Sequence, residues 1–248
     1  MGRIVAVGIG AGLLSGLFGV GGGILIVPGL VMLGGMDRRI AHGTSLAAVL
    51  PISLSSLVTY WTGGHVDWAV ALWLTVGAVA GAFLGTRLLN VLPHDTLALA
   101  FAALLVVTAV RLYLPLDSGT RSDVSVLLAL GLVAAGVVTG VLAGLLGVGG
   151  GVVMVPAMMM LLHLPAVIAK GTSLAVIIPT SIVGTWRNRK SRNVELGAAA
   201  VVGAGGILAA VAGGRIASHM SDSVSNALFA TLLVVVAARL VLDMRRPH

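Results

Sequence analysis

The sequence predicts an all-α polytopic membrane protein built from two homologous repeats. Hydrophobic residues make up 58% of the 248 residues and charged residues only 9%, with a mean hydropathy of +1.11. A soluble domain carries roughly 25% charged residues, so this chain lacks the charge to cover a surface in water. Apolar stretches recur along it, and each reaches the roughly 18 residues needed to cross a bilayer. We therefore expect a multi-pass protein of the cell (inner) membrane.

The second observation is an internal duplication at an offset of 128 residues. Residues 11–28 read AGLLSGLFGVGGGILIVP and residues 139–156 read TGVLAGLLGVGGGVVMVP, with 11 of 18 positions identical. Residues 41–54 read AHGTSLAAVLPISL and residues 169–182 read AKGTSLAVIIPTSI, with eight of 14 identical. Two pseudo-symmetric halves are a common plan of secondary transporters.

Each repeat contains one long apolar stretch followed by three shorter ones. The first repeat has them at 4–35, 43–62, 68–91 and 96–114. The second has them at 125–162, 171–187, 195–217 and 224–242. Short polar turns separate the stretches, and the segment Leu116–Asp123 is the candidate linker between the halves. We expect a single integral membrane domain over 1–248, with repeat one at 1–115 and repeat two at 124–244.

The first stretch of each repeat is longer than one crossing requires and is interrupted by GVGGG, at Gly19–Gly23 and at Gly147–Gly151. Three consecutive glycines cost roughly 1 kcal/mol each in a helix. Pro28 and Pro156 follow, and proline disfavours the helix before it. Each repeat therefore opens with a glycine-broken helix, which is either two half-helices in line or a re-entrant hairpin.

The form of this broken element decides the topology. A crossing element gives four crossings per repeat and parallel repeats, whereas a re-entrant element gives three crossings and inverted repeats. Counting Lys and Arg by side gives 10 against 5 for the first topology and 11 against 4 for the second, with both termini in the cytoplasm in each. We favour inverted repeats, because that plan builds a site from two broken helices that face each other near the midplane.

The GVGGG segments are the leading candidates for a ligand site. Backbone N–H groups freed at the break, together with the positive end of the following half-helix, attract an anion. Tight helix packing is the alternative use of such glycines, but recurrence at a fixed offset before a proline favours the ligand site. We assign six glycines to it: Gly21, Gly22, Gly23, Gly149, Gly150 and Gly151.

Hydroxyl and basic side chains open the next stretch of each repeat. Hydroxyls in this position either cap the helix start or donate to the oxygens of an anion, and both uses stay open. Lys170 would add positive charge near the site, while a cation at the membrane edge is the alternative for a lysine at a helix end. These residues complete the candidate site: Thr44, Ser45, Thr172, Ser173, Lys170 and His42.

Three further stripes of glycines at four-residue spacing are assigned to close helix packing rather than to a ligand. They are Gly8, Gly12 and Gly16; Gly77, Gly81 and Gly85; and Gly136, Gly140 and Gly144.

The acidic residues fall in predicted turns, at helix ends or in the C-terminal tail. We therefore expect no carboxylate proton relay and no acidic pore ring at membrane depth, and no metal, cofactor or catalytic residues. A charged ligand held by hydroxyls, N–H groups and a cation is then an anion. The net charge of +7 comes from helix ends and loops, as topology signals do. We expect the bilayer and a small anion as partners, allow for a homodimer, and expect no nucleic acid.

The two motifs GxxxGxxGVGGGxxxVP and AxGTSLA, each present twice, resemble the TauE/SafE family of sulfite exporters, also called the TSUP family. The first motif lies at Gly12–Pro28 and Gly140–Pro156, the second at Ala41–Ala47 and Ala169–Ala175. The resemblance covers essentially the whole chain. It implies a membrane permease for sulfite, sulfonates or other sulfur-containing anions.

We therefore expect a secondary transporter that moves a small sulfur-containing anion, such as sulfite, thiosulfate or an organosulfonate, by alternating access around a midplane site. A passive anion channel is the alternative. A membrane-embedded enzyme would need a catalytic set at membrane depth, and the placement of acidic and histidine residues argues against one.

Overall fold

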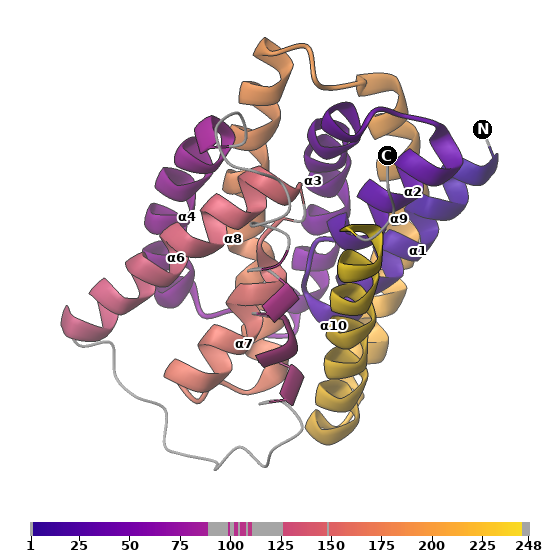
Figure 1. Cartoon of the computed structure of the whole chain (residues 1–248). Coiled ribbons are helices and arrows are strands. Elements are labelled where there is room, and N and C mark those ends of the chain that lie inside the picture. The colour runs from indigo at the N-terminus through magenta and orange to yellow at the C-terminus, as the bar shows by residue number, and fades with distance from the viewer. Residues whose placement is uncertain are drawn as a thin grey trace.

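The computed structural model describes residues 2–88, 99, 102–103, 105–107, 109–110, 126–147 and 149–244, and these residues form helices joined by short turns (Figure 1). The first half contains α1 (Gly2–Phe18), α2 (Gly23–Gly34), α3 (Arg38–Thr62) and α4 (Trp68–Leu88). The second contains α6 (Val126–Leu146), α7 (Gly151–Leu161), α8 (Ala166–Lys190), α9 (Leu196–Ser218) and α10 (Asp222–Met244). Among the described residues, five helices are long and apolar enough to cross a membrane: α3, α4, α6, α8 and α9. The predicted all-helical polytopic class is confirmed.

Helix bounds in the second half follow those in the first at the offset seen in the sequence. α3 and α8 each have 25 residues and begin at Arg38 and Ala166, and α2 and α7 begin at Gly23 and Gly151. α3 and α8 begin five residues before the predicted stretches. In α3 this start is fixed by Asp37, whose Oδ1 accepts a hydrogen bond from Arg39 N at 2.8 Å. The predicted stretch 96–114 and the candidate linker lie mostly outside the described residues; those described within the stretch are helical.

The long first stretch of each half is a helical hairpin rather than two helices in line. α1 and α2 pack antiparallel, because a Cβ on Gly22 would lie 2.5 Å from Ala11 O and one on Gly29 would lie 2.6 Å from Val7 Cγ1. α6 and α7 repeat this arrangement, and a Cβ on Gly150 would lie 3.1 Å from Thr139 O. Pro28 and Pro156 lie inside α2 and α7. The chain therefore reverses at the glycines, and the prolines do not end a helix.

Helices of the first half pack along helices of the second half. α1 of the first half packs along α9 of the second, and α4 of the first half packs along α6 of the second. Glycine stripes make these approaches: a Cβ on Gly12 would lie 2.1 Å from Gly206 O, and one on Gly81 would lie 2.1 Å from Val137 O. No larger residue fits at such distances, so the predicted role of the stripes in close helix packing is confirmed.

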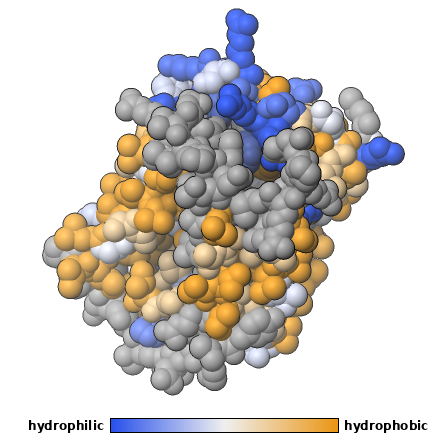
Figure 2. Space-filling model, viewed as in Figure 1, coloured by the Kyte–Doolittle hydropathy of each residue, from blue (hydrophilic) through white to orange (hydrophobic). Residues whose placement is uncertain are grey.

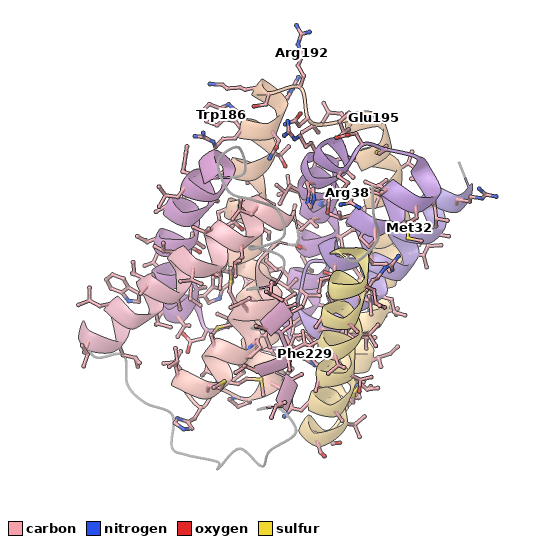
Figure 3. All side chains as sticks on the ribbon, viewed as in Figure 1. Met32, Arg38, Trp186, Arg192, Glu195 and Phe229 are labelled. Atoms are coloured by element: carbon pink, nitrogen blue, oxygen red, sulfur yellow. The ribbon has the colours of Figure 1, made fainter. Side chains whose placement is uncertain are left out.

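The matched helices α3 and α8 are the two most buried of the five spans, and they run antiparallel. Gly43 near the start of α3 lies against Asn193 beyond the end of α8, while Gly171 near the start of α8 lies against His65 beyond the end of α3. A Cβ on either glycine would lie 2.1 Å from the facing carbonyl oxygen. Arg38 and Arg192 accordingly lie at the same end of the molecule (Figure 3).

Many described apolar side chains are exposed. Figure 2 shows hydrophilic residues gathered at the end that carries Arg38 and Arg192, with apolar residues over much of the described surface below it. Large apolar side chains that are half exposed or more include Leu72, Leu130 and Leu208. Exposed apolar side chains of this kind suit contact with lipid.

Candidate functional site

Two glycine turns join the helices of the hairpins. The first glycine turn is Gly19–Gly22, and the second consists of Gly147, Gly149 and Gly150. Their φ angles are positive at Gly19 (68°), Gly21 (75°), Gly22 (77°), Gly147 (65°), Gly149 (81°) and Gly150 (78°). Residues with a Cβ rarely adopt this left-handed conformation. The reversal of the chain therefore explains why glycine stands at matched positions in both halves.

Each glycine turn is followed by a short helix whose N-terminus is buried inside the protein. Gly22 is the N-cap of α2, and the first hydrogen bonds of this helix run from Leu25 N and Ile26 N to Gly22 O at 3.0 and 3.2 Å. Gly150 caps α7 in the same way, and a glycine at this position has no side chain to accept from the first N–H groups. The N–H groups ahead of these bonds have no acceptor within the helix. Together with the positive end of the helix dipole they form a ready site for an anion.

The two glycine turns lie against each other. A Cβ on Gly151 would lie 2.5 Å from Gly19 O, and one on Gly149 would lie 3.6 Å from Val20 O. Val20 is fully buried. The structure therefore brings the six glycines of the candidate site into one buried region, although they come from opposite halves of the chain.

Val49 and Ile177 occupy matched positions at the centres of α3 and α8 and contact both turns. A Cβ on Gly21 would lie 3.0 Å from Val49 Cγ1 and 3.2 Å from Ile177 Cγ2. A Cβ on Gly149 would lie 3.7 and 3.4 Å from the same two methyl groups. Both side chains are fully buried, so the region between the turns is lined by methyl groups.

Ser45 and Ser173 hold the glycine turn of the opposite half. Ser45 Oγ donates to Gly147 O at 2.9 Å, and Ser173 Oγ donates to Gly19 O at 2.6 Å. Ser173 Oγ also lies 2.7 Å from Lys170 O. A hydroxyl has a single proton to donate, so in this conformation the two serines position the turns.

The hydroxyls of Thr44 and Thr172 accept hydrogen bonds from the residues that precede two other helices. Thr44 Oγ1 accepts from Glu195 N and Thr172 Oγ1 accepts from Asp67 N, both at 2.9 Å. Glu195 and Asp67 directly precede α9 and α4. Because α3 and α8 begin six residues before these threonines, the alternative in which the hydroxyls cap their own helices does not apply.

Each glycine turn also packs on a basic residue, and the residue differs between the halves. A Cβ on Gly19 would lie 2.7 Å from Lys170 Cα, whereas one on Gly147 would lie 3.1 Å from His42 Nδ1. Lys170 and His42 are matched at the offset of 128. The site is therefore symmetric in its backbone and asymmetric in its basic side chains.

Lys170 is 2% exposed and is the one charged side chain that is buried in the part of the chain that the structure describes. Its Nζ donates to Ser225 Oγ of α10 and lies 5.7 Å from the centre of the Phe18 ring. Phe229 of α10, labelled in Figure 3, stacks on Phe18 with ring centres 5.4 Å apart. Positive charge next to an aromatic face is favourable. The backbone and Cβ of Lys170 thus pack on Gly19, while its ammonium group is turned towards Ser225 and Phe18.

Two matched serines that the sequence analysis did not single out have buried hydroxyls without a partner. Ser53 and Ser181 are fully buried, and neither Oγ has a hydrogen bond to a described residue. Ser53 Oγ lies 3.2 Å from the position of a Cβ on Gly21. An unpaired buried hydroxyl costs roughly 1–3 kcal/mol, so the two serines join the candidate residues of the site. Their signal is in the sequence: both are identical in the second matched segment, two residues after Pro51 and Pro179.

The described carboxylates belong to helix ends. Asp37, Asp67 and Glu195 each precede a helix. Within the described ranges, no three histidine, aspartate or glutamate side chains come together as a group that could hold a metal ion. None of these three carboxylates is among the groups that the glycine contacts place at the turns.

A multi-pass helical protein with two buried glycine turns and helix N-termini at its centre has the architecture of a membrane transporter. The chain belongs to the sulfite exporter TauE/SafE family, whose model matches residues 2–112 and 132–248. This membership confirms the resemblance found in the sequence.

Individual relatives carry transporter names as well. The chain is 27% identical over 265 residues to "Probable membrane transporter protein YunE" of Bacillus subtilis, covering 97% of each protein. It is 28% identical over 242 residues to a protein of Xylella fastidiosa named "Probable membrane transporter protein", covering 94% of this chain and 93% of that one. It is 31% identical over 189 residues to "Probable membrane transporter protein MJ0441" of Methanocaldococcus jannaschii, covering 73% and 69%. No solved structure matches the chain significantly. These names point to transport rather than catalysis, in a multi-pass protein of the cell membrane.

Proposed function

We propose that this protein is a secondary transporter that moves a small sulfur-containing anion, such as sulfite, thiosulfate or an organosulfonate, across the cell membrane. The observation that carries the proposal is the meeting of two buried helix N-termini with the unpartnered hydroxyl of Ser53, with a second unpartnered hydroxyl at the matched Ser181 and the buried Lys170 packed on the first turn. N–H groups, hydroxyls and an ammonium group all donate hydrogen bonds or attract negative charge. The family description, sulfite exporter, supports a sulfur oxyanion as the ligand.

The proposed site divides its residues by task. Backbone N–H groups of Gly21–Gly23 and Gly149–Gly151 and the hydroxyls of Ser53 and Ser181 contact the anion. Thr44, Ser45, Thr172 and Ser173 keep the turns and the neighbouring helices in place, as their present hydrogen bonds suggest. Lys170 and His42 supply positive charge beside the first and second turn. Groups that are already fixed in position bind a ligand at a lower entropic cost.

We also propose that the two halves are inverted repeats which provide alternating access. The antiparallel packing of the matched helices α3 and α8 supports inversion, as do the hairpins, which return to the side from which they start. Each half would then cross the membrane three times. Rocking one half against the other around a fixed central site exposes the anion to each side in turn.

A passive anion channel is the second candidate. A channel requires a continuous open pathway and carries large currents without any coupled movement of a second solute. Val49 and Ile177 are fully buried between the glycine turns. An occluded centre of this kind favours a transporter over an open pore.

Uptake into liposomes that contain the purified protein tests the proposal. Radiolabelled sulfite or thiosulfate should enter faster than into protein-free liposomes, and the rate should saturate with concentration. Planar bilayers with the same protein should show no large anion current. Saturable uptake without such a current supports a transporter, whereas a large ohmic current identifies a channel. Absence of flux for sulfite, thiosulfate and organosulfonates alike overturns the proposal.

A further inference from the structure

We propose that Val49 and Ile177 set the size limit of the transported anion and confine it to compact oxyanions such as sulfite and thiosulfate. Organosulfonates that carry a carbon chain would be excluded. The inference rests on the proposed transport function and deepens it by narrowing the class of substrate.

The position of the two side chains relative to the turns carries the first step. The methyl groups of Val49 and Ile177 lie within 3.0–3.7 Å of the Cβ positions of both Gly21 and Gly149. Ile177 Cδ1 also lies 2.9 Å from the Cβ position of Gly151, at the start of α7. An anion that lies over the glycine turns therefore meets these methyl groups on the side away from the backbone.

The helix register carries the second step. Val49 and Ser53 are four residues apart on α3, as are Ile177 and Ser181 on α8. Residues at this spacing lie one above the other on the same face of a helix. Each matched helix thus presents a β-branched side chain and an unpartnered hydroxyl to the same region, and Ser53 Oγ lies 3.2 Å from the Cβ position of Gly21.

The third step is the apolar character of the side chains of Val49 and Ile177. A compact oxyanion consists almost entirely of oxygens that can accept from N–H and hydroxyl donors, so it has no further group that must fit beside these methyl groups. The tail of an organosulfonate such as taurine (2-aminoethanesulfonate) would press on methyl groups in a fully buried region. The tail is therefore excluded on steric grounds.

Competition transport in liposomes tests the size limit. We would measure radiolabelled sulfite and taurine uptake by the wild-type chain, by Val49→Ala and by Ile177→Ala. One methylene in an apolar pocket discriminates by about 10-fold or more. We therefore expect the ratio of taurine to sulfite uptake to rise about 10-fold in either variant. The wild-type chain should transport sulfite and little taurine.

Matched variants keep this test decisive. Val176→Ala is the control, because Val176 is a fully buried core residue next to Ile177 and its matched position in the first half is already alanine, Ala48. This variant should leave the ratio of taurine to sulfite uptake unchanged. The exchange variants Val49→Ile and Ile177→Val copy the residue of the other half, so they remain informative if an alanine variant fails to fold. Val49→Ile should lower the ratio and Ile177→Val should raise it.

The outcomes separate the two proposals. An unchanged ratio in folded variants, or equal wild-type uptake of taurine and sulfite, overturns the size limit while leaving transport established. A wild-type chain that moves none of the anions overturns the proposed function itself, and the size limit falls with it.

Discussion

Buried serine hydroxyls of α3 and α8 are found in two different states. Those of Ser45 and Ser173 are bonded to backbone carbonyls of the opposite half, at 2.9 and 2.6 Å. Those of Ser53 and Ser181 are equally buried but have no described partner. The first pair contributes to the folded structure, whereas an unpaired buried hydroxyl of the second kind lowers its stability. A substitution separates the two roles.

Replacing Ser53 and Ser181 together by alanine should impair transport without harming the fold. Hydrogen bonds to a charged group contribute about 1.5–3 kcal/mol each, so KM for sulfite should rise at least about 10-fold. Thermal unfolding should be unchanged or shifted upwards, because the variant buries no unpaired hydroxyl. Uptake kinetics and thermal unfolding in detergent measure the two effects.

The control for this experiment is Ser45→Ala with Ser173→Ala. These substitutions remove hydrogen bonds that the protein makes to itself, so each should lower the free energy of unfolding by about 1 kcal/mol. If the Ser53 and Ser181 variant loses as much stability as this control, the two hydroxyls are part of the fold and are not ligand groups.

At the scale of helices, the pairs α1–α9 and α4–α6 depend on backbone-to-backbone approach. Gly12→Ala would place a Cβ 2.1 Å from Gly206 O. Overpacking costs typically about 1–3 kcal/mol, so this variant should unfold at a clearly lower temperature. Gly131→Ala in α6 is the matched control, since nothing lies within 4 Å of its Cβ position. That control should gain up to about 1 kcal/mol from helix propensity; equal losses in both variants would contradict the packing role.

The hairpins also make a prediction about sidedness. The chain has no cysteine, so Met36→Cys between α2 and α3 and His163→Cys between α7 and α8 can each be labelled alone. With re-entrant hairpins, an impermeant maleimide should reach position 163 from outside intact cells and position 36 only in inverted vesicles. Two crossing elements would instead place both positions outside. Labelling both positions from outside therefore rules out the hairpin topology in the membrane.

Sequence patterns predicted the elements better than their arrangement. The glycine run predicted a break in the first stretch of each half, since its helix cost is local. The hairpin was left open, because it depends on contacts such as Gly29 with Val7, and the loop charges differ by one between the two topologies. Ser53 and Ser181 were not separated from the other hydroxyls for a similar reason. Ser45 finds its acceptor 102 residues away and Ser173 finds one 154 residues away, and no local pattern reveals which hydroxyls remain unpaired.

At the scale of the whole molecule, the two halves interlock. α1 packs along α9, α4 along α6, and each half provides the serine that holds the other half's glycine turn. We therefore expect a chain cut between Gly119 and Thr120, within the candidate linker, to assemble from its two pieces. Co-expressed pieces should co-purify through a tag on either one. Each piece expressed alone should aggregate or be degraded, and a monodisperse single piece would refute the interlocked arrangement.

The reciprocal serine–turn hydrogen bonds have a consequence for how such a chain originates. Neither half contains both the donor and the acceptor of these bonds, so a protein consisting of one repeat would form them only by pairing with a second copy of itself. Two identical copies carry the same basic residue beside both turns. Joining the copies in one chain removes that constraint, and here one turn packs on Lys170 and the other on His42. Fusion thus allows the two glycine turns to have different basic neighbours, which a symmetric pair of identical subunits cannot provide.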